Sequence, residues 1–308
     1  MQRLARLRAN IQTCFLGNEQ AIDKLMACLL ARGHVLIEDV PGVGKTTLAS
    51  ALARSVDVTL ARVQLTPDML PADVLGVTVW DQQKSEFVFK PGPIFANVVL
   101  ADEINRTTPR TQSALLEAMA EGQVSIDGLT RKLIEPFFVI ATQNPHEFEG
   151  TYFLPESQLD RFLMRINLGY PTREDEERIL THDPTRSALT NIKPVMTSQE
   201  LIELQQQVQQ VAIDPTLVGY IVTLATATRE NEHLQVGISP RGSLALAAVA
   251  KATAVIQGRD YVVPDDITSN VVDVFAHRCI SDTYLHDADA RTIPNVIQDI
   301  LESVPSPV

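Results

Sequence analysis

The stretch that decides the fold runs from residue 35 to residue 47 and reads Val35-Leu36-Ile37-Glu38-Asp39-Val40-Pro41-Gly42-Val43-Gly44-Lys45-Thr46-Thr47. Its first four residues are a short apolar run, which predicts a strand buried on both faces of a parallel sheet. A glycine-rich loop follows and opens a helix predicted over residues 46–54. Loops of this kind bind phosphate because small residues let several backbone N–H groups turn toward one anion.

The residue types in this loop suit a nucleoside triphosphate. A lysine can meet the charge of the β and γ phosphates and a hydroxyl can hold Mg²⁺, and Lys45 and Thr46 supply these groups. The strict pattern has a glycine where Asp39 stands, but at the loop entrance its side chain can point away from the phosphates. The alternative is a chance glycine-rich turn. We expect cofactor contacts from Pro41, Gly42, Val43, Gly44, Lys45, Thr46 and Thr47.

Two further apolar runs end in polar residues. Residues 98–101 lead into Asp102 and Glu103, where Asp102 can hold a water on Mg²⁺ and Glu103 can accept a proton from the attacking water. Residues 137–141 lead to Asn144, a candidate for positioning that water. Each has a plainer alternative, because acids often mark a solvated strand end and an asparagine before Pro145 can cap a turn.

Composition narrows the class of protein. The chain has 308 residues, of which 45% are hydrophobic and 21% are charged, as in a globular protein of one large or two ordinary domains. A net charge of −12 argues against a free-standing nucleic-acid binder, because phosphate neutralisation needs clustered Lys and Arg. The three cysteines have no CxxC spacing, no apolar run reaches membrane-spanning length, and the six histidines form no zinc motif. We therefore expect a cytoplasmic protein.

The spacing of hydrophobic residues changes along the chain. Residues 32–170 alternate strand-like and helix-like segments, which predicts a doubly wound α/β layer with helices at 46–54, 111–121 and 158–164. After Pro171 the pattern becomes helical, with capping-box starts at 172–175 and 197–200 and no strand pattern. We expect an α/β core over residues 1–170 and a small helical domain over 171–308, with helices at 215–229, 239–257, 264–280 and 293–303.

The order of these motifs resembles the AAA+ ATPases. It runs from the phosphate loop through Asp102-Glu103 and Asn144 to Leu159-Asp160-Arg161-Phe162 and Ser239-Pro240-Arg241. The loop, the segment Asp102-Glu103-Ile104-Asn105-Arg106 and residues 155–162 are similar to the MoxR branch in particular. The resemblance covers residues 7–304 and implies a P-loop AAA+ parallel-sheet three-layer sandwich followed by an all-helical lid domain. It also implies ATP and Mg²⁺ as cofactors.

The resemblance implies roles for two arginines. Arg161 matches the arginine finger that reaches into a neighbouring subunit's nucleotide site, which implies a ring, most simply a hexamer. Arg241 matches the sensor-2 arginine of the lid, where it would meet a phosphate that Lys45 also contacts. Ser239 is a good N-cap and Pro240 a good first-turn residue, so the helix dipole would add to the guanidinium in favouring phosphate. The alternative for either arginine is a surface salt bridge.

Two segments also resemble insertions of the MoxR branch. Residues 65–95 look like the insertion around the second helix that faces a central pore. Residues 123–132 contain Asp127-Gly128 between alternating segments, which predicts a β-hairpin. Direct contact with substrate and an ordinary exposed hairpin remain equal alternatives for it. The absence of a guanine-reading motif favours adenine as the base, with contacts near Leu16-Gly17 and within the lid.

These features predict a molecular machine that hydrolyses ATP to remodel, mature or activate a client protein, as a chaperone does. The resemblance implies a partner with a von Willebrand A domain. One alternative is a motor in a magnesium-chelatase-like complex, and a less favoured one is a nucleic-acid-remodelling AAA+ factor, which the net charge disfavours. A small-molecule kinase is disfavoured because Asp102, Glu103 and Asn144 suit the activation of water.

Overall fold

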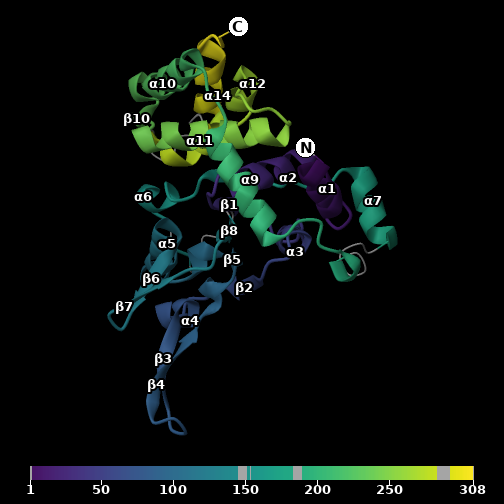
Figure 1. Cartoon of the computed structure of the whole chain (residues 1–308). Coiled ribbons are helices and arrows are strands. Elements are labelled where there is room, and N and C mark those ends of the chain that lie inside the picture. The colour runs from purple at the N-terminus through teal and green to yellow at the C-terminus, as the bar shows by residue number, and fades with distance from the viewer. Residues whose placement is uncertain (1, 145–150, 153, 183–188, 283–291, 308) are drawn as a thin grey trace.

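A five-stranded parallel sheet organises the first half of the chain (Figure 1). The computed structural model describes residues 2–144, 151–152, 154–182, 189–282 and 292–307. The strand order is β2-β5-β8-β1-β9, and every neighbouring pair is parallel. The strands are β1 (Val35–Glu38), β2 (Leu60–Gln64), β5 (Val98–Asp102), β8 (Phe138–Gln143) and β9 (Met164–Ile166). Their carboxyl ends therefore lie at one edge, with β1 and its loop between β8 and β9.

Alternate residues of these strands enter two separate apolar clusters. In β5, Val98 and Leu100 join one cluster while Val99 and Ala101 join the other. The first cluster contains α1 (Gln2–Gln12), α2 (Glu19–Leu30) and α3 (Lys45–Ser55), and the second contains α5 (Pro109–Glu121). Because successive strand side chains point to opposite faces, the sheet lies between two helical layers. The predicted three-layer α/β sandwich is confirmed.

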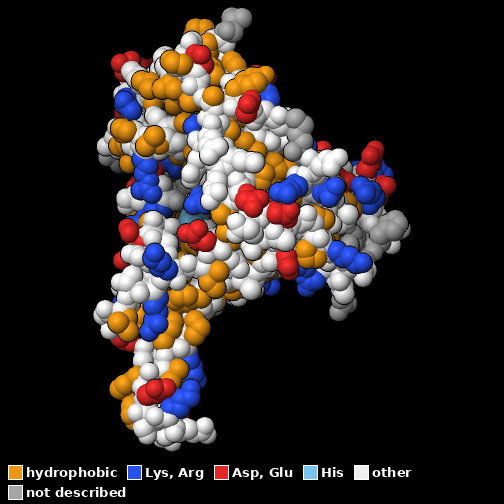
Figure 2. All heavy atoms as spheres, in the orientation of Figure 1, with side chains coloured by type: hydrophobic (Ala, Val, Ile, Leu, Met, Phe, Trp, Pro, Cys, Tyr) orange, Lys and Arg blue, Asp and Glu red, His pale blue; other side chains and the backbone are white. Residues whose placement is uncertain are grey.

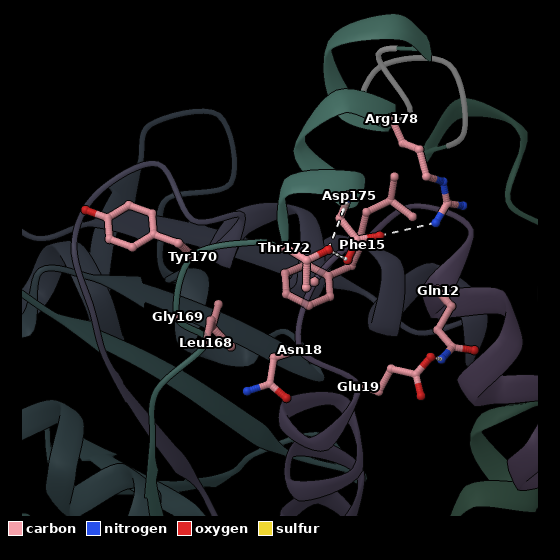
Figure 3. A pocket seen from close by; sticks show the side chains of 12 residues that line it. Gln12, Phe15, Asn18, Glu19, Leu168, Gly169, Tyr170, Thr172, Asp175 and Arg178 are labelled. Carbon is pink, nitrogen blue, oxygen red and sulfur yellow. Dashed lines mark hydrogen bonds and ion pairs between the residues drawn. The ribbon is translucent and has the colours of Figure 1, made fainter.

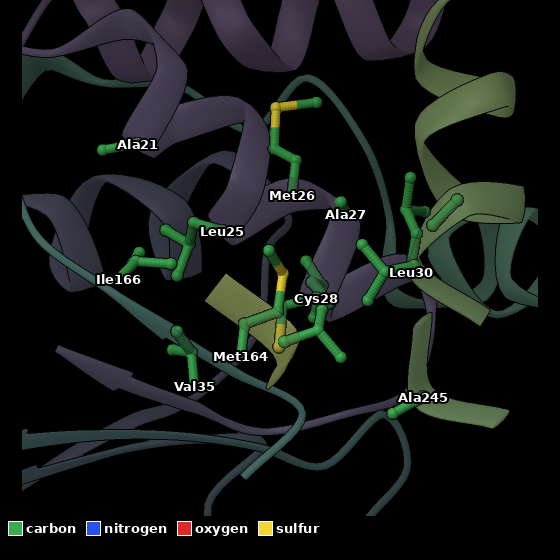
Figure 4. Packing of buried hydrophobic residues seen from close by; sticks show 14 of the residues in the cluster. Ala21, Leu25, Met26, Ala27, Cys28, Leu30, Val35, Met164, Ile166 and Ala245 are labelled. Carbon is green, nitrogen blue, oxygen red and sulfur yellow. The ribbon is translucent and has the colours of Figure 1, made fainter. Parts of the chain in front are cut away.

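Helices dominate the second half of the chain, as expected for a lid. They are α7 (Arg173–His182), α9 (Ser198–Gln210), α10 (Pro215–Glu230), α11 (Pro240–Ile256), α12 (Pro264–Thr268), α13 (Val271–Phe275) and α14 (Ile293–Ser303). Helix α11 packs against α2, and Figure 4 shows Ala245 of α11 in the same packing as Leu30 and Met164. One apolar cluster thus spans the predicted boundary at residue 170. Within the described residues, no helix is long and apolar enough to cross a membrane.

The sequence-based helix limits are wrong in two places. The helix expected over 264–280 is broken into α12, α13 and the 3-10 turn Ala276–Arg278, because the Asn270 side chain donates a hydrogen bond to the Asp266 carbonyl in place of the backbone. The helix expected over 158–164 shrinks to α6 (Glu156–Leu159), since Met164 already pairs with Val35 of β1. In addition, the helical half contains a short strand pair, β10 (Leu234–Val236) and β11 (Ile280–Ser281), which the sequence did not suggest.

Both predicted insertions contain β-hairpins. Residues 65–95 hold α4 (Pro71–Leu75), β3 (Gly76–Asp81) and β4 (Glu86–Pro91), and this hairpin projects away from the body of the molecule (Figures 1 and 2). Strands β6 (Gln123–Ile126) and β7 (Leu129–Lys132) form the second hairpin, with both turn residues at positive φ, Asp127 at 53° and Gly128 at 75°. The Arg131 guanidinium lies 4.0 Å above the Phe89 ring and joins the two hairpins.

A buried histidine ties α5 to the sheet and gives the fold a pH dependence. His34 Nδ1 accepts a hydrogen bond from Val139 N, and Nε2, 3.0 Å from the Met119 carbonyl, is left to donate. Both bonds need the neutral ring, and burial lowers the pKa of His34 from 6.5 to about 4.

We expect the free energy of unfolding to fall as pH drops from 6.5 toward 4. In this pH range His34 becomes protonated in the unfolded chain but stays neutral in the native protein. Between pH 6.5 and pH 5 the loss from this group is about 2 kcal/mol. Urea titrations at both pH values test it. His34→Gln should be less stable at neutral pH but show a flatter pH dependence, whereas exposed His233→Gln should retain the wild-type slope. An equal slope in all three proteins would contradict the assignment.

Candidate functional site

The phosphate loop lies between the carboxyl end of β1 and the start of α3. Gly42 and Gly44 have φ of 91° and 93°, in the left-handed region that side chains other than glycine avoid. Gly44 is also crowded, because a Cβ there would stand 3.2 Å from the Phe15 ring. The Lys45 ammonium donates to the Asp39 carbonyl at 2.6 Å. The two glycines thus allow the loop conformation in which backbone N–H groups can bind an anion, and Lys45 lines the adjoining cavity.

The loop forms one wall of a cavity of about 300 Å³ whose other walls come from neighbouring strands. Asp102 at the end of β5 and Asn144 after β8 face this cavity together with Lys45 and Thr46. The structure thus gathers the predicted loop residues other than Val43, both acids and Asn144 around one space. Pro145, whose presence suggested a turn cap at Asn144, lies outside the described residues. The full lining is Pro41, Gly42, Gly44, Lys45, Thr46, Thr47, Arg62, Gln64, Asp102, Glu103, Thr142 and Asn144.

The two acids are held by side chains that sequence reasoning missed. Asp102 is buried and accepts hydrogen bonds from Arg62 Nε at 2.7 Å and Thr142 Oγ1 at 3.2 Å. The Glu103 amide donates to the same Thr142 hydroxyl at 3.0 Å, so this one side chain positions both acids. Arg62 lies on strand β2. A strand predicted at residues 60–64 would have drawn attention to this arginine.

Glu103 stands in a strained backbone conformation with its carboxylate occupied. Its φ is 58°, which is rare for a residue other than glycine and common at functional sites. The carboxylate accepts hydrogen bonds from Gln64 Nε2 at 2.7 Å and from Arg106 Nη1 at 3.2 Å. These contacts hold the acid beside the cavity.

A second group of cavities adjoins the loop on the side of α7. A space of about 170 Å³ is lined by Gly42, Val43 and Gly44 on one side and by Leu16 and Gly17 on the other. It shares Phe15, Leu16, Gly17 and Gly169 with a larger cavity of about 680 Å³ between the α1–α2 connection and the start of α7 (Figure 3). The residues predicted near the base thus lie next to the phosphate loop.

The two predicted arginines contact groups outside the cavity around Lys45. Arg161 donates to the Leu116 carbonyl at 2.8 Å, and Arg241 Nε lies 3.4 Å from Asp160 Oδ2. Buried Arg278 donates to the other Asp160 oxygen at 2.8 Å. Ser239 caps α11 as expected, with Pro240 in its first turn. Neither Arg161 nor Arg241 lines the cavity that contains Lys45.

Comparison with known sequences agrees with the class that this fold and site define. Residues 34–164 match the ATPase family associated with various cellular activities (AAA), and residues 226–300 match the AAA lid domain. The protein is therefore an AAA-type ATPase with a nucleotide-binding core and a lid. A crystal structure from Cytophaga hutchinsonii, classed as a candidate ATPase, superimposes with a TM-score of 0.92 at 36% identity over 100% of this chain and 96% of the other.

Full-length relatives narrow the family. The Bacillus subtilis protein YeaC is 45% identical over 99% of this chain and 95% of its own length. The Mycobacterium tuberculosis protein Chaperone MoxR1 is 41% identical over 99% of this chain and 82% of its own length. The chain belongs to the MoxR family of AAA+ ATPases.

Proposed function

We propose that this protein hydrolyses ATP to ADP and phosphate at the cavity around Lys45. The observation that carries the proposal is the convergence of the phosphate loop, two acids and Asn144 on one space of about 300 Å³. The loop amides and Lys45 would bind the phosphates, Glu103 would accept a proton from the attacking water, and Asn144 would orient that water. The adjoining cavities beside Gly17 would take the adenosine.

The residues at this site fit Mg²⁺. Thr46 and Asp102 bring a hydroxyl and a buried carboxylate to the same cavity, and these are the hard oxygen groups that Mg²⁺ prefers. The described residues contain no cluster of three or more acidic, His or Cys side chains able to hold a metal by themselves. This fits an ion bound by one or two protein groups and the substrate phosphates. There it would neutralise charge on the β and γ phosphates.

Thr142→Val should lower kcat for ATP hydrolysis about tenfold with little change in ATP binding. The substitution keeps the side-chain shape but removes the hydroxyl that positions both acids, whereas the loop itself is untouched. Steady-state kinetics and calorimetric ATP titration measure the two effects. Thr59→Val is the matched control, because its hydroxyl bonds Asn97 before β5, at the opposite edge of the sheet. A Thr142→Val protein with normal kcat would remove this residue from the mechanism.

We further propose that Arg161 and Arg241 act on the nucleotide of a neighbouring subunit in a ring, most simply a hexamer. The Arg241 side chain pairs with Asp160, the residue before Arg161, and neither arginine lines the cavity of its own chain, which supports a role across a subunit boundary. The Arg241 side chain is 58% exposed, so it is available to a neighbour. The contact of one phosphate with Lys45 and Arg241 would then involve two subunits.

The proposed client role is supported by exposed apolar side chains on the two hairpins and by the similarity to Chaperone MoxR1. Trp80 and Phe87 pair edge to face on the first hairpin with 52% and 72% of their surfaces exposed, and Leu129 is exposed on the second. Large exposed apolar side chains on a projecting element suit contact with another protein (Figure 2). We infer that the protein remodels a client or adaptor protein, with a von Willebrand A domain protein as the partner to test first.

Capture with an ATP-bound variant tests this client role against the alternatives. The Glu103→Gln protein with ATP should retain a client that the wild type releases, and the same capture with Lys45→Ala provides the negative control. ATPase stimulation by single-stranded DNA, without such a client, would instead favour the nucleic-acid-remodelling alternative. Recovery of chelatase subunits would favour the magnesium-chelatase-like motor.

A further inference from the structure

The structure gives a role to Asp39, which stands where the strict phosphate-loop pattern has glycine. Its Oδ2 accepts hydrogen bonds from the backbone N–H groups of Leu168 and Gly169, each at 2.8 Å. Its Oδ1 accepts from the N–H of Val40, also at 2.8 Å. The carboxylate thus points away from the phosphate cavity and ties the loop to the segment between β9 and α7.

Strand pairing explains why these groups meet. Strands β1 and β9 run parallel with Ile37 opposite Ile166, so Asp39 and Leu168 both lie two residues beyond that pair. At this point the ladder has ended, and the backbone N–H groups of residues 168 and 169 would otherwise lack a strand partner. Three charge-assisted hydrogen bonds to one carboxylate make a strong local connection.

The backbone of Asp39 connects the same residue to the catalytic groups. Its carbonyl accepts the hydrogen bond from Lys45 Nζ at 2.6 Å, and its N–H donates to the Gln143 carbonyl at 3.1 Å. Gln143 directly precedes Asn144. A single residue therefore contacts the phosphate-binding lysine, the strand that carries Asn144 and the linker to the helical half.

The linker that Asp39 holds forms part of the adjoining cavities. Gly169, with φ of 71°, lines both of them, and Leu168 and Tyr170 line the larger one (Figure 3). Thr172 follows and accepts a hydrogen bond from Asp175 N, which starts α7. A displacement of residues 168–169 would therefore move both a cavity wall and the first turn of α7.

We propose that Asp39 is a positioning residue that transmits phosphate occupancy of the loop to the linker 168–172 and to α7, an inference that rests on the proposed ATP function. A phosphate draws Lys45 from the neutral Asp39 carbonyl, because an ammonium binds an anion more strongly than a carbonyl. The loop then readjusts around Asp39, and its carboxylate carries the change to Leu168 and Gly169. A glycine at position 39 would leave loop and linker without this connection.

Hydrogen exchange of the full chain, followed by mass spectrometry, tests the connection in Asp39→Gly. Without ligand, exchange of the segment containing residues 168 and 169 should be at least about tenfold faster than in the wild type, because two charge-assisted bonds are lost. Asp214→Gly is the matched control, since Asp214 accepts an N–H bond from Thr216 at the start of α10, away from the linker. It should leave exchange at 168–169 unchanged.

The coupling itself needs a nucleotide-dependent measurement. ATP in a Glu103→Gln background should change exchange across α7, and the added Asp39→Gly substitution should abolish that change while circular dichroism shows a folded protein. Asp39→Asn keeps one acceptor oxygen and should give intermediate values in both experiments, and it decides the question if Asp39→Gly does not fold.

Two results would overturn the proposal. The first is wild-type exchange at residues 168–169 in a folded Asp39 variant, and the second is an undiminished ATP-dependent change in α7. Failure of the proposed function has a different signature, because the parent protein with Asp39 intact would then neither bind nor hydrolyse ATP. The ligand-free exchange experiment still measures the Asp39 contact in that case.

Discussion

Glu103→Gln is expected to retain ATP binding and to lose hydrolysis by a factor on the order of 10² to 10⁴, the range for removal of a positioned general base. The amide keeps the size of the side chain and its acceptor oxygen for Gln64 and Arg106. It cannot accept a proton from water, so the loss falls on the transition state.

Lys45→Ala should show the opposite pattern. It removes the ammonium at the mouth of the loop, and ATP binding should weaken about tenfold or more because a charge-assisted contact with phosphate is lost. Calorimetric titration and phosphate release separate the two variants. Glu117→Gln on the exposed face of α5 controls for the loss of one negative charge. Normal hydrolysis by Glu103→Gln would show that another group activates the water.

Arg161→Ala should lower ATP hydrolysis by a factor on the order of 10³, the lower end of the range for an arginine that neutralises γ-phosphate charge in the transition state. The effect should depend on assembly, because Arg161 does not line the cavity of its own chain. We expect nucleotide-dependent rings, which sedimentation velocity with and without ATP would detect.

Mixing subunits tests whether Arg161 acts across the boundary. Arg161→Ala subunits retain Lys45, and Lys45→Ala subunits retain Arg161. An interface is complete when a subunit of the first kind supplies the nucleotide site and one of the second kind supplies the arginine. In a ring assembled at random from an equal mixture, about a quarter of the interfaces meet this condition. Activity should therefore rise well above that of either variant alone. Arg173→Ala, whose side chain is 91% exposed on α7, should match the wild type. Full activity of a strictly monomeric preparation would contradict the ring proposal.

Most residues of the nucleotide site could be predicted from the sequence. An apolar strand precedes the loop that contains Gly42, Gly44 and Lys45. Few backbone conformations suit such a loop, so its position could be predicted from local sequence. Asp102 and Asn144 end parallel strands, whose carboxyl ends must share one edge. The structure places these residues around one cavity, while their catalytic roles remain predictions for the experiments above.

Other features depend on contacts between segments far apart in the chain. Thr142, Arg62 and Gln64 carry no motif, and only the pairing of β2, β5 and β8 brings them to the acids. The helix expected through residue 164 gives way to β9 because pairing with β1 outweighs local propensity.

Sequence alone determined the fold class, the phosphate loop and the set of residues at the strand ends, because these follow from local periodicity and from loop geometry. Only the tertiary structure decided that Asp39 binds the linker, that Arg241 pairs with Asp160, and that neither Arg161 nor Arg241 lines the cavity around Lys45. The physical reason is that hydrogen-bond partners more than 100 residues apart, such as Asp39 and Leu168, are chosen by strand order and helix packing.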